Sequence, residues 1–224
     1  MKCPLVFIAA VCLLAAGCGS TSVTSERQAE TKAVADEHIV VLLSRYIRQG
    51  VVEKELESVE SGLEACIRAA AQRANETQAF LYPADFRRLI SAKPTGTEAP
   101  GSPELVLRWL NEPAIAARLA AARVRFVVLL EASYHTSESR WGGGGGGGGF
   151  AIGKEWVQNA SIQATILDLK HARIAGSINS RSSGPEGGGV GVLIIIPFPI
   201  YFTSMAESRA CAAIGTALAR FVSN

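Results

Sequence analysis

Apolar residues follow two different spacings along this chain, and the spacings separate predicted strands from predicted helices. Between residues 160 and 166, apolar side chains alternate with polar ones, which is typical of a half-buried strand. Between residues 52 and 74, apolar residues fall three and four positions apart: Leu56, Val59, Leu63, Cys66, Ile67 and Ala70. That spacing puts one apolar face on a helix, because a helix repeats every 3.6 residues.

The same criteria predict an α/β (α+β) fold for the whole chain. Expected strands cover residues 39–43, 77–82, 124–135, 160–168 and 173–182. Expected helices cover residues 52–74 and 102–123, the second restarting at Pro113, and a last helix carries Met205, Cys211, Ile214, Leu218 and Phe221 on one side. The order β-α-β-α-β-β-β-α predicts a mixed sheet of about five strands with helices packed on it, ending in an antiparallel meander and a closing helix.

The amino terminus has the pattern of an export signal. Lys2 is followed by an apolar run and then by "LAAGCGS", which resembles the lipobox of bacterial lipoproteins. The resemblance implies that residues 1–17 are removed and that Cys18 is acylated on its thiol and on its new amino group. The alternatives are an ordinary secretory leader or an uncleaved anchor, but the apolar run is short for a membrane span. Gly19 and Ser20 stand where an aspartate would retain such a protein in the inner membrane, so we expect the outer membrane, on its periplasmic face.

The remainder of the chain divides into two parts. Residues 18–36 are polar and small without an apolar period, so they predict a flexible tether with a reach of roughly 60 Å. Residues 37–224 then form a single periplasmic domain. Of the five cysteines, only Cys66 and Cys211 lie in that domain. They can form a disulfide in an oxidising compartment or remain two buried thiols.

Composition limits the classes of partner. The chain has 224 residues, 48% of them hydrophobic, and a formal net charge of +2, so it gives no electrostatic reason to expect nucleic acid binding. A nucleotide site is also disfavoured. Residues 148–154 match the phosphate-binding pattern G-x-x-x-x-G-K, but Glu155 stands where that loop needs Ser or Thr, and a strand rather than a helix follows. The glycine run "WGGGGGGGGF" is therefore interpreted as a flexible connection between two antiparallel strands.

Catalytic and metal-binding patterns are weak. The three histidines, His38, His135 and His171, have no metal-ligand spacing, and the serines lack the G-x-S-x-G pattern. We therefore expect no enzyme activity, no cofactor and no metal. An envelope hydrolase is kept as an unfavoured alternative.

Three stretches carry a family resemblance: "RFVVLLEAS", "ASIQATILDLKHARIAGSINS" and "AESRACAAIGTALARFV". With the element order, they resemble the periplasmic α/β domain shared by the curli-secretion channel lipoprotein, the lipoprotein activators of penicillin-binding proteins and the amino-terminal domain of TolB. The resemblance covers residues 39–222 and implies a role in envelope assembly or secretion through protein contacts. The sequence departs from that family at His171 and Ala172, where the hairpin usually has a glycine.

The predicted meander brings the glycine run and the apolar stretch "VGVLIIIPFPIYF" to one pole of the domain. We predict that this pole contacts a protein of the cell envelope. The expected contact residues are Trp141, Phe150, Pro197, Phe198, Pro199 and Tyr201. The alternative is an oligomeric secretion or pore complex, in which copies of the chain associate. We place it second because glycines are poor strand formers and neither stretch alternates as a membrane strand does.

Overall fold

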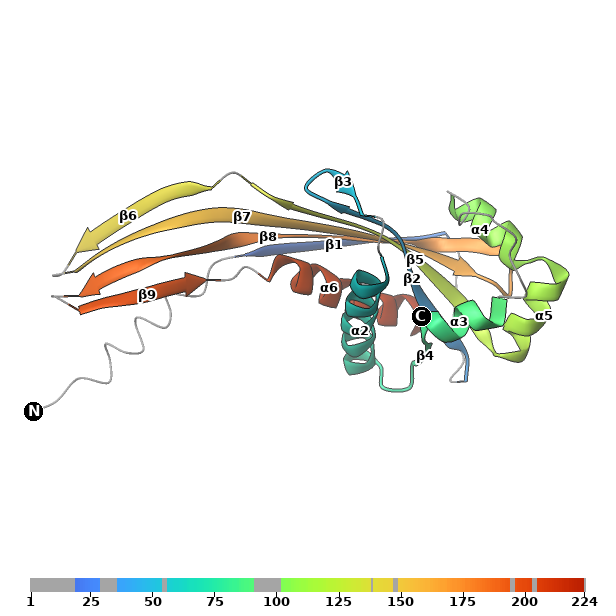
Figure 1. The fold of residues 1–224 in the computed structure, drawn as a ribbon. Coiled ribbons are helices and arrows are strands. Elements are labelled where there is room, and N and C mark those ends of the chain that lie inside the picture. Colours follow the sequence, from blue (N-terminus) through green and yellow to red (C-terminus); the bar gives the residue numbers. More distant parts are fainter. Residues whose placement is uncertain are drawn as a thin grey trace, which may run out of the picture.

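The computed structural model describes residues 19–28, 36–53, 56–90, 102–137, 139–146, 149–193, 196–202 and 205–223. Within these residues one mixed sheet has the order β1-β8-β7-β5-β2-β3, while β4 pairs with β2, β6 with β7, and β9 with β8. The predicted α/β fold with helices packed on a mixed sheet is confirmed (Figure 1). The strands are β1 (Ser20–Arg27), β2 (His38–Arg48), β3 (Val51–Val52), β4 (Ala79–Leu81), β5 (Val124–Thr136), β6 (Arg140–Gly146), β7 (Gly149–Asp168), β8 (Arg173–Leu193) and β9 (Ile196–Phe202). The helices are α2 (Glu57–Ala74), α3 (Pro83–Ile90), α4 (Pro103–Leu110), α5 (Pro113–Ala121) and α6 (Ala206–Ser223).

The helices form two layers, one on each face of the sheet. Strand β2 shows this most clearly, because Ile39 and Val41 pack into a core with α2 and α6, whereas Val40 packs into a second core with α3, α4 and α5. Consecutive side chains of a strand point to opposite faces. A strand covered on both faces is therefore apolar throughout, as the unbroken run in β2 is.

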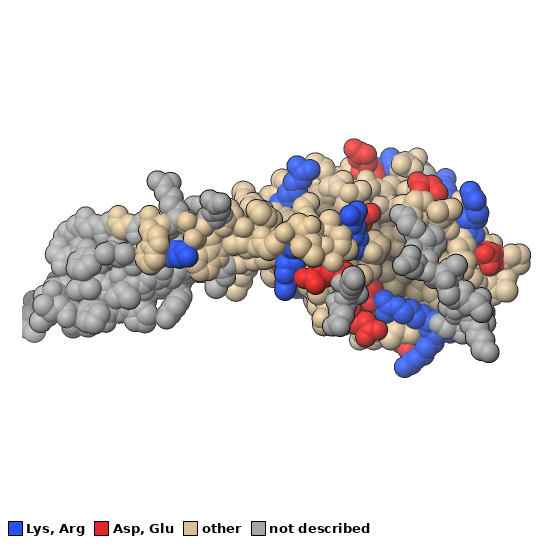
Figure 2. Space-filling model, turned by 45° about the horizontal axis from the view of Figure 1, so that its top comes forward, with Lys and Arg blue, Asp and Glu red and all other residues tan. Residues whose placement is uncertain are grey.

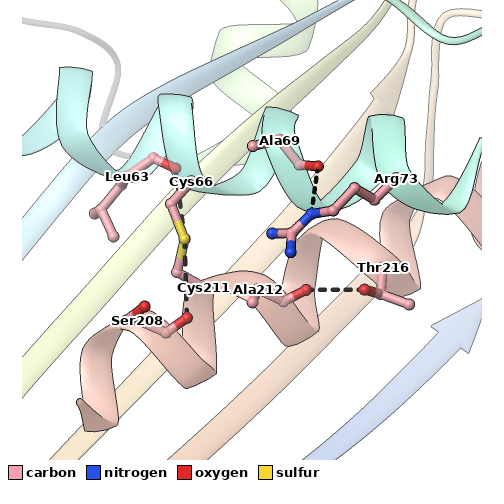
Figure 3. Close-up of a disulfide and its surroundings, with 8 residues drawn as sticks. All are labelled: Leu63, Cys66, Ala69, Arg73, Ser208, Cys211, Ala212 and Thr216. Carbon is pink, nitrogen blue, oxygen red and sulfur yellow. Dashed lines mark hydrogen bonds between the residues drawn. A yellow bond between two sulfur atoms is a disulfide. The ribbon is translucent and has the colours of Figure 1, made fainter. Parts of the chain in front are cut away.

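Helices α2 and α6 are in direct contact along one face of the sheet. Gly215 of α6 lies against α2, where a Cβ atom would overlap the carbonyl oxygen of Ile67 and approach the Cβ atom of Ala70 to 2.7 Å. One turn earlier, Cys66 and Cys211 form a disulfide between the two helices, which decides between the two states left open by the sequence (Figure 3). Cys211 is buried and Cys66 is partly exposed. The two helices are thus held both covalently and by close packing.

Two buried glutamates lie one turn apart on α2. Glu60 accepts a hydrogen bond from the backbone N–H of Leu43 at 2.9 Å and forms an ion pair with Arg87 of α3. Glu64 forms an ion pair with Arg68 at 3.3 Å. Burial raises the pKa of the Glu64 carboxyl group; the charge of Arg68 lowers it and that of Glu60 raises it. Because burial is the largest of the three effects, the charged form of Glu64 costs folding free energy.

We expect Glu64→Gln to stabilise the protein at pH 7, because the effect of burial on the Glu64 carboxylate outweighs the attraction of Arg68, and glutamine removes the charge at nearly the same side-chain volume. The pKa of Glu64 is raised on folding, so its favourable contribution is present in acid and is lost as the pH rises through the folded-state pKa. The difference in unfolding free energy between variant and wild type should therefore grow from acid to neutral pH. Urea unfolding at several pH values measures it, with the exposed Glu57→Gln on the same helix as the control. A difference independent of pH would contradict this prediction.

The structure differs from the expected fold at its edges. The segment expected to be a tether forms β1 over Ser20–Arg27, so the predicted tether of residues 18–36 is wrong for these eight residues. All eight are exposed and most are Ser or Thr, so no apolar period announces the strand. Backbone pairing with β8 forms it instead. Strands β3, β6 and β9 are further additions to the five expected strands.

Candidate functional site

Two strands run through the whole molecule and continue beyond its helical part. Strand β7 pairs with β5 over residues 158–168 and with β6 over residues 149–155. Strand β8 pairs with β1 over residues 176–183 and with β9 over residues 187–193. The four strands β6-β7-β8-β9 therefore project as one sheet, which we call the extension; the helix-covered remainder is the body (Figure 1). In this view no described helix covers either face of the extension.

The pairing brings the predicted contact residues together in the extension. One row across the sheet contains Trp141, Lys154, Gly188 and Tyr201, each paired with the next. Paired positions share a face, and every second residue along a strand returns to it. The face of that row therefore holds five of the six predicted positions: Trp141, Phe150, Pro197, Pro199 and Tyr201. The sixth, Phe198, falls on the opposite face. Trp141 is 70% exposed.

The glycine run is part of a strand, so the prediction of a flexible connection is wrong for residues 142–146. They pair residue by residue with positions 149–153 of β7, while Gly147 and Gly148 lie outside the described residues. Glycine has low strand propensity, but a long neighbouring strand supplies backbone hydrogen bonds regardless of side chain. Because these glycines form a strand, their low strand propensity gives no reason to disfavour a membrane-associated oligomer.

Charged residues become fewer from the body toward the extension. Residues 142–146, 149–153, 187–193 and 196–202 contain no charged residue. Figure 2 shows the charged side chains gathered over the body on the face in view, with few on the neck that leads to the extension. Seven residues of β9 correspond to a length of roughly 23 Å at about 3.3 Å per residue.

A groove of about 960 Å³ opens at the end of the body nearest the extension, between α2, α6 and the ends of β2 and β5. In its wall, the Tyr46 hydroxyl donates to Oε1 of Glu207 at 3.5 Å. Burial, and then the charge of Glu207, raises the pKa of Tyr46. The Arg48 guanidinium lies 5.7 Å from the centre of the Tyr46 ring. These contacts join β2 to the start of α6, and the groove also exposes the side of the disulfide at Cys66.

The end of the body farthest from the extension holds a buried charged cluster around Asp168. Its side chain is fully buried and pairs with Arg125 at 3.0 Å and with Nδ1 of His171 at 2.7 Å. Ala172, in the hairpin between β7 and β8, adopts a left-handed conformation with φ of 49°. The cluster therefore stabilises a turn that alanine makes costly. It lies next to a smaller pocket of about 450 Å³.

Exposed apolar side chains gather at the extension end of the body, and sequence reasoning missed most of them. We call this group the collar: Val51, Val52, Trp141, Val157 and Met205, with exposed fractions between 38% and 70%. Neighbouring strands connect these residues across the sheet. Val51 of β3 pairs with Arg48 of β2, and Arg48 pairs with Tyr134 of β5. Tyr134 in turn pairs with Ala160 of β7, three residues from Val157. Met205 lines the groove beside Gln158. Val51, Val52 and Val157 lie on strands outside any apolar period, so no sequence pattern identified them. Trp141 was expected at this pole, whereas Met205 was expected on the apolar side of the last helix and instead precedes α6 with its side chain 65% exposed.

Three further observations concern sites and membrane segments. Cys18, the predicted acylation site, lies outside the described residues. Among the residues that the structure describes, no group of three or more His, Cys, Asp or Glu side chains is arranged to hold a metal ion. In the same part of the chain, no helix has the length and apolar character needed to cross a membrane.

Comparison with known proteins gives distant structural likenesses only. No family model matches the chain, and no curated protein matches it. A PelC dodecamer variant from Paraburkholderia phytofirmans is 12% identical, with 92% of this chain and 100% of that chain covered and a TM-score of 0.38. A neuraminyllactose-binding hemagglutinin homolog from Helicobacter pylori is 11% identical, covering 88% and 89% of the two chains with a TM-score of 0.34. Protein CT253 from Chlamydia trachomatis is 10% identical, covering 83% and 98% with a TM-score of 0.32. At these scores the likenesses carry no conclusion about function.

Proposed function

We propose that this protein is a non-enzymatic lipoprotein of the outer membrane, facing the periplasm, and that its extension binds a protein of the cell envelope. One observation carries the proposal: a four-stranded sheet of glycine and apolar residues projects from the body with no described helix over it. An apolar sheet face left uncovered loses the free energy of burial, and such surfaces mark sites of association.

The prolines of β9 favour contact through a face of the extension rather than through its edge. Proline has no N–H, and along an antiparallel strand alternate residues turn their backbone groups to alternate sides. Pro197 and Pro199 are two residues apart, so their backbone nitrogens lie on the same edge of β9. When that edge is the free one, the missing N–H groups cost β9 none of its hydrogen bonds to β8. That edge then has few donors for a further strand. A partner is accordingly expected to cover the face of the extension that contains Tyr201.

Crosslinking in cells tests this assignment. Tyr201→Ala should reduce the yield of the partner crosslink at least tenfold, because aromatic side chains dominate the binding energy of many interfaces. Phe198→Ala, on the opposite face, should have a smaller effect, and Leu105→Ala, exposed on α4, is the matched control in the body. Identical crosslink yields for all three variants, with unchanged thermal unfolding, would exclude the extension as the contact surface.

A subunit of an oligomeric secretion or pore complex is the second candidate. It is favoured by the absence of charged residues from residues 142–146, 149–153, 187–193 and 196–202. The charge-free stretches of β8 and β9 have seven residues each, roughly 23 Å, which is close to the apolar band of about 25 Å in outer-membrane proteins. Those of β6 and β7 have five residues each, roughly 17 Å. In lipid the free backbone groups of β6 and β9 would require strands from neighbouring copies. This candidate predicts large ring-shaped particles in mild detergent, whereas a monomer there would contradict it.

A further inference from the structure

Strand β1 is fixed to the body by specific contacts although its side chains are exposed. Its eight residues pair with residues 176–183 of β8. Arg27 donates a hydrogen bond to the carbonyl oxygen of Phe221 in α6 and lies 4.7 Å from the centre of the Phe221 ring. Gly176 makes room for the strand, because a Cβ atom there would overlap the carbonyl oxygen of Glu26 and approach Phe221 to 2.9 Å. These contacts hold β1 as a rigid link.

The other end of β1 lies at the junction of body and extension. Ser20 pairs with Ser183, four residues before β8 begins its pairing with β9 at Gly187. Gly19 lies against the guanidinium of Arg209, a residue of the first turn of α6, because a Cβ atom at this position would overlap that group. Arg209 also donates to the carbonyl oxygen of Ser183 at 3.1 Å. In the sequence Cys18 directly precedes Gly19.

The collar surrounds this same junction. Trp141 and Lys154 are paired on β6 and β7, and both are exposed. Tryptophan and lysine are typical of membrane interfaces, where an aromatic ring or an aliphatic stem lies against lipid and the polar end stays in water. Val51, Val52 and Met205 add exposed apolar surface. The predicted lipid anchor and the exposed apolar residues of the body are therefore at one end of the molecule.

The geometry points to a lipid bilayer surface as the partner of the collar, with β1 holding the acylated Cys18 at that surface. This inference rests on the proposed lipid anchor. The body is then held directly on the membrane, whereas a tether of eighteen residues would let it move roughly 60 Å away. A partner of the extension is accordingly to be sought within the membrane. A collar that bound protein instead would leave Trp141 out of contact with lipid.

Tryptophan fluorescence of the full-length lipidated protein tests this placement. The protein is reconstituted into vesicles of phosphatidylethanolamine and phosphatidylglycerol, with and without lipids brominated near the upper end of the acyl chain. The chain has three tryptophans, at positions 109, 141 and 156. In a W109F/W156F variant, which keeps Trp141, brominated lipid should reduce the emission at least twofold. The matched W141F/W156F variant keeps Trp109 of α4, whose emission should not change.

A longer link provides a second variant that leaves the fold untouched. Ten Gly and Ser residues inserted between Cys18 and Gly19 should preserve flotation with vesicles but reduce the quenching of Trp141, because the body is freed from the surface. Flotation of the original protein without quenching of Trp141 would contradict contact between the collar and lipid, but would be consistent with the lipid anchor. Loss of flotation would overturn both. Equal quenching with the short and the long link would overturn the role of β1.

Discussion

Replacing Gly215 with alanine is expected to destabilise the folded protein by about 2–3 kcal/mol, because one added methyl group would push α6 away from α2. The new Cβ atom would overlap the carbonyl oxygen of Ile67 and lie 2.7 Å from the Cβ atom of Ala70. Alanine favours a helix over glycine by up to about 1 kcal/mol, so the steric cost is larger than the gain in propensity.

The control is the same substitution on the partner helix. Gly62 of α2 has no neighbouring atom within 4 Å of a Cβ position, so Gly62→Ala should stabilise the protein by up to about 1 kcal/mol. Urea unfolding of the two variants then gives shifts of opposite sign. Stabilisation by both would mean that α2 and α6 do not approach each other at Gly215.

Removing the disulfide is expected to cost about 2–5 kcal/mol of stability. Cys66 and Cys211 are 145 residues apart, and a crosslink that closes a long loop restricts the unfolded chain strongly. The Cys66→Ala/Cys211→Ala variant should unfold at a lower urea concentration than the wild type. The close contact at Gly215 remains, so the variant is expected to fold.

Reduction provides the control for this second prediction. A reducing agent should lower the stability of the wild type toward that of the double variant and leave the double variant unchanged, because residues 37–224 contain no other cysteine. An effect of the reducing agent on both proteins, or on neither, would be inconsistent with a stabilising disulfide between α2 and α6.

The parts of the fold that sequence predicted are those with a buried face. Ala160, Ile162, Ala164 and Ile166 alternate because one side of β7 packs against helices, and that alternation is visible in the sequence. Strand β1 has no buried side chain, and β6 is mostly glycine, so neither has a period to detect. Strand β1 forms along residues 176–183 of β8 within the body, whereas β6 forms along the part of β7 that continues beyond β5.

The candidate site was predictable in position but not in form. An antiparallel meander places alternate connections at one end, so Trp141 and Tyr201 were expected at one pole, and pairing in the structure joins them through Lys154 and Gly188. The assignment of position 198 to the other face depends on the register between β8 and β9. A sequence does not determine that register when glycines and prolines interrupt the alternation of apolar and polar residues. The collar depends on how the sheet brings β3, β6, β7 and the start of α6 together at one end of the body.

Strands β7 and β8 cross from body to extension without interruption, and this continuity has a mechanical consequence. The twenty residues of β7 pair with β5 at one end and with β6 at the other. No linker separates the two parts, so the extension cannot rotate freely about a hinge. Any load applied to its tip must bend a continuous sheet and reaches the helices beneath it. The extension and the body therefore move as one rigid unit, and α2 and α6 stiffen the body end of the sheet.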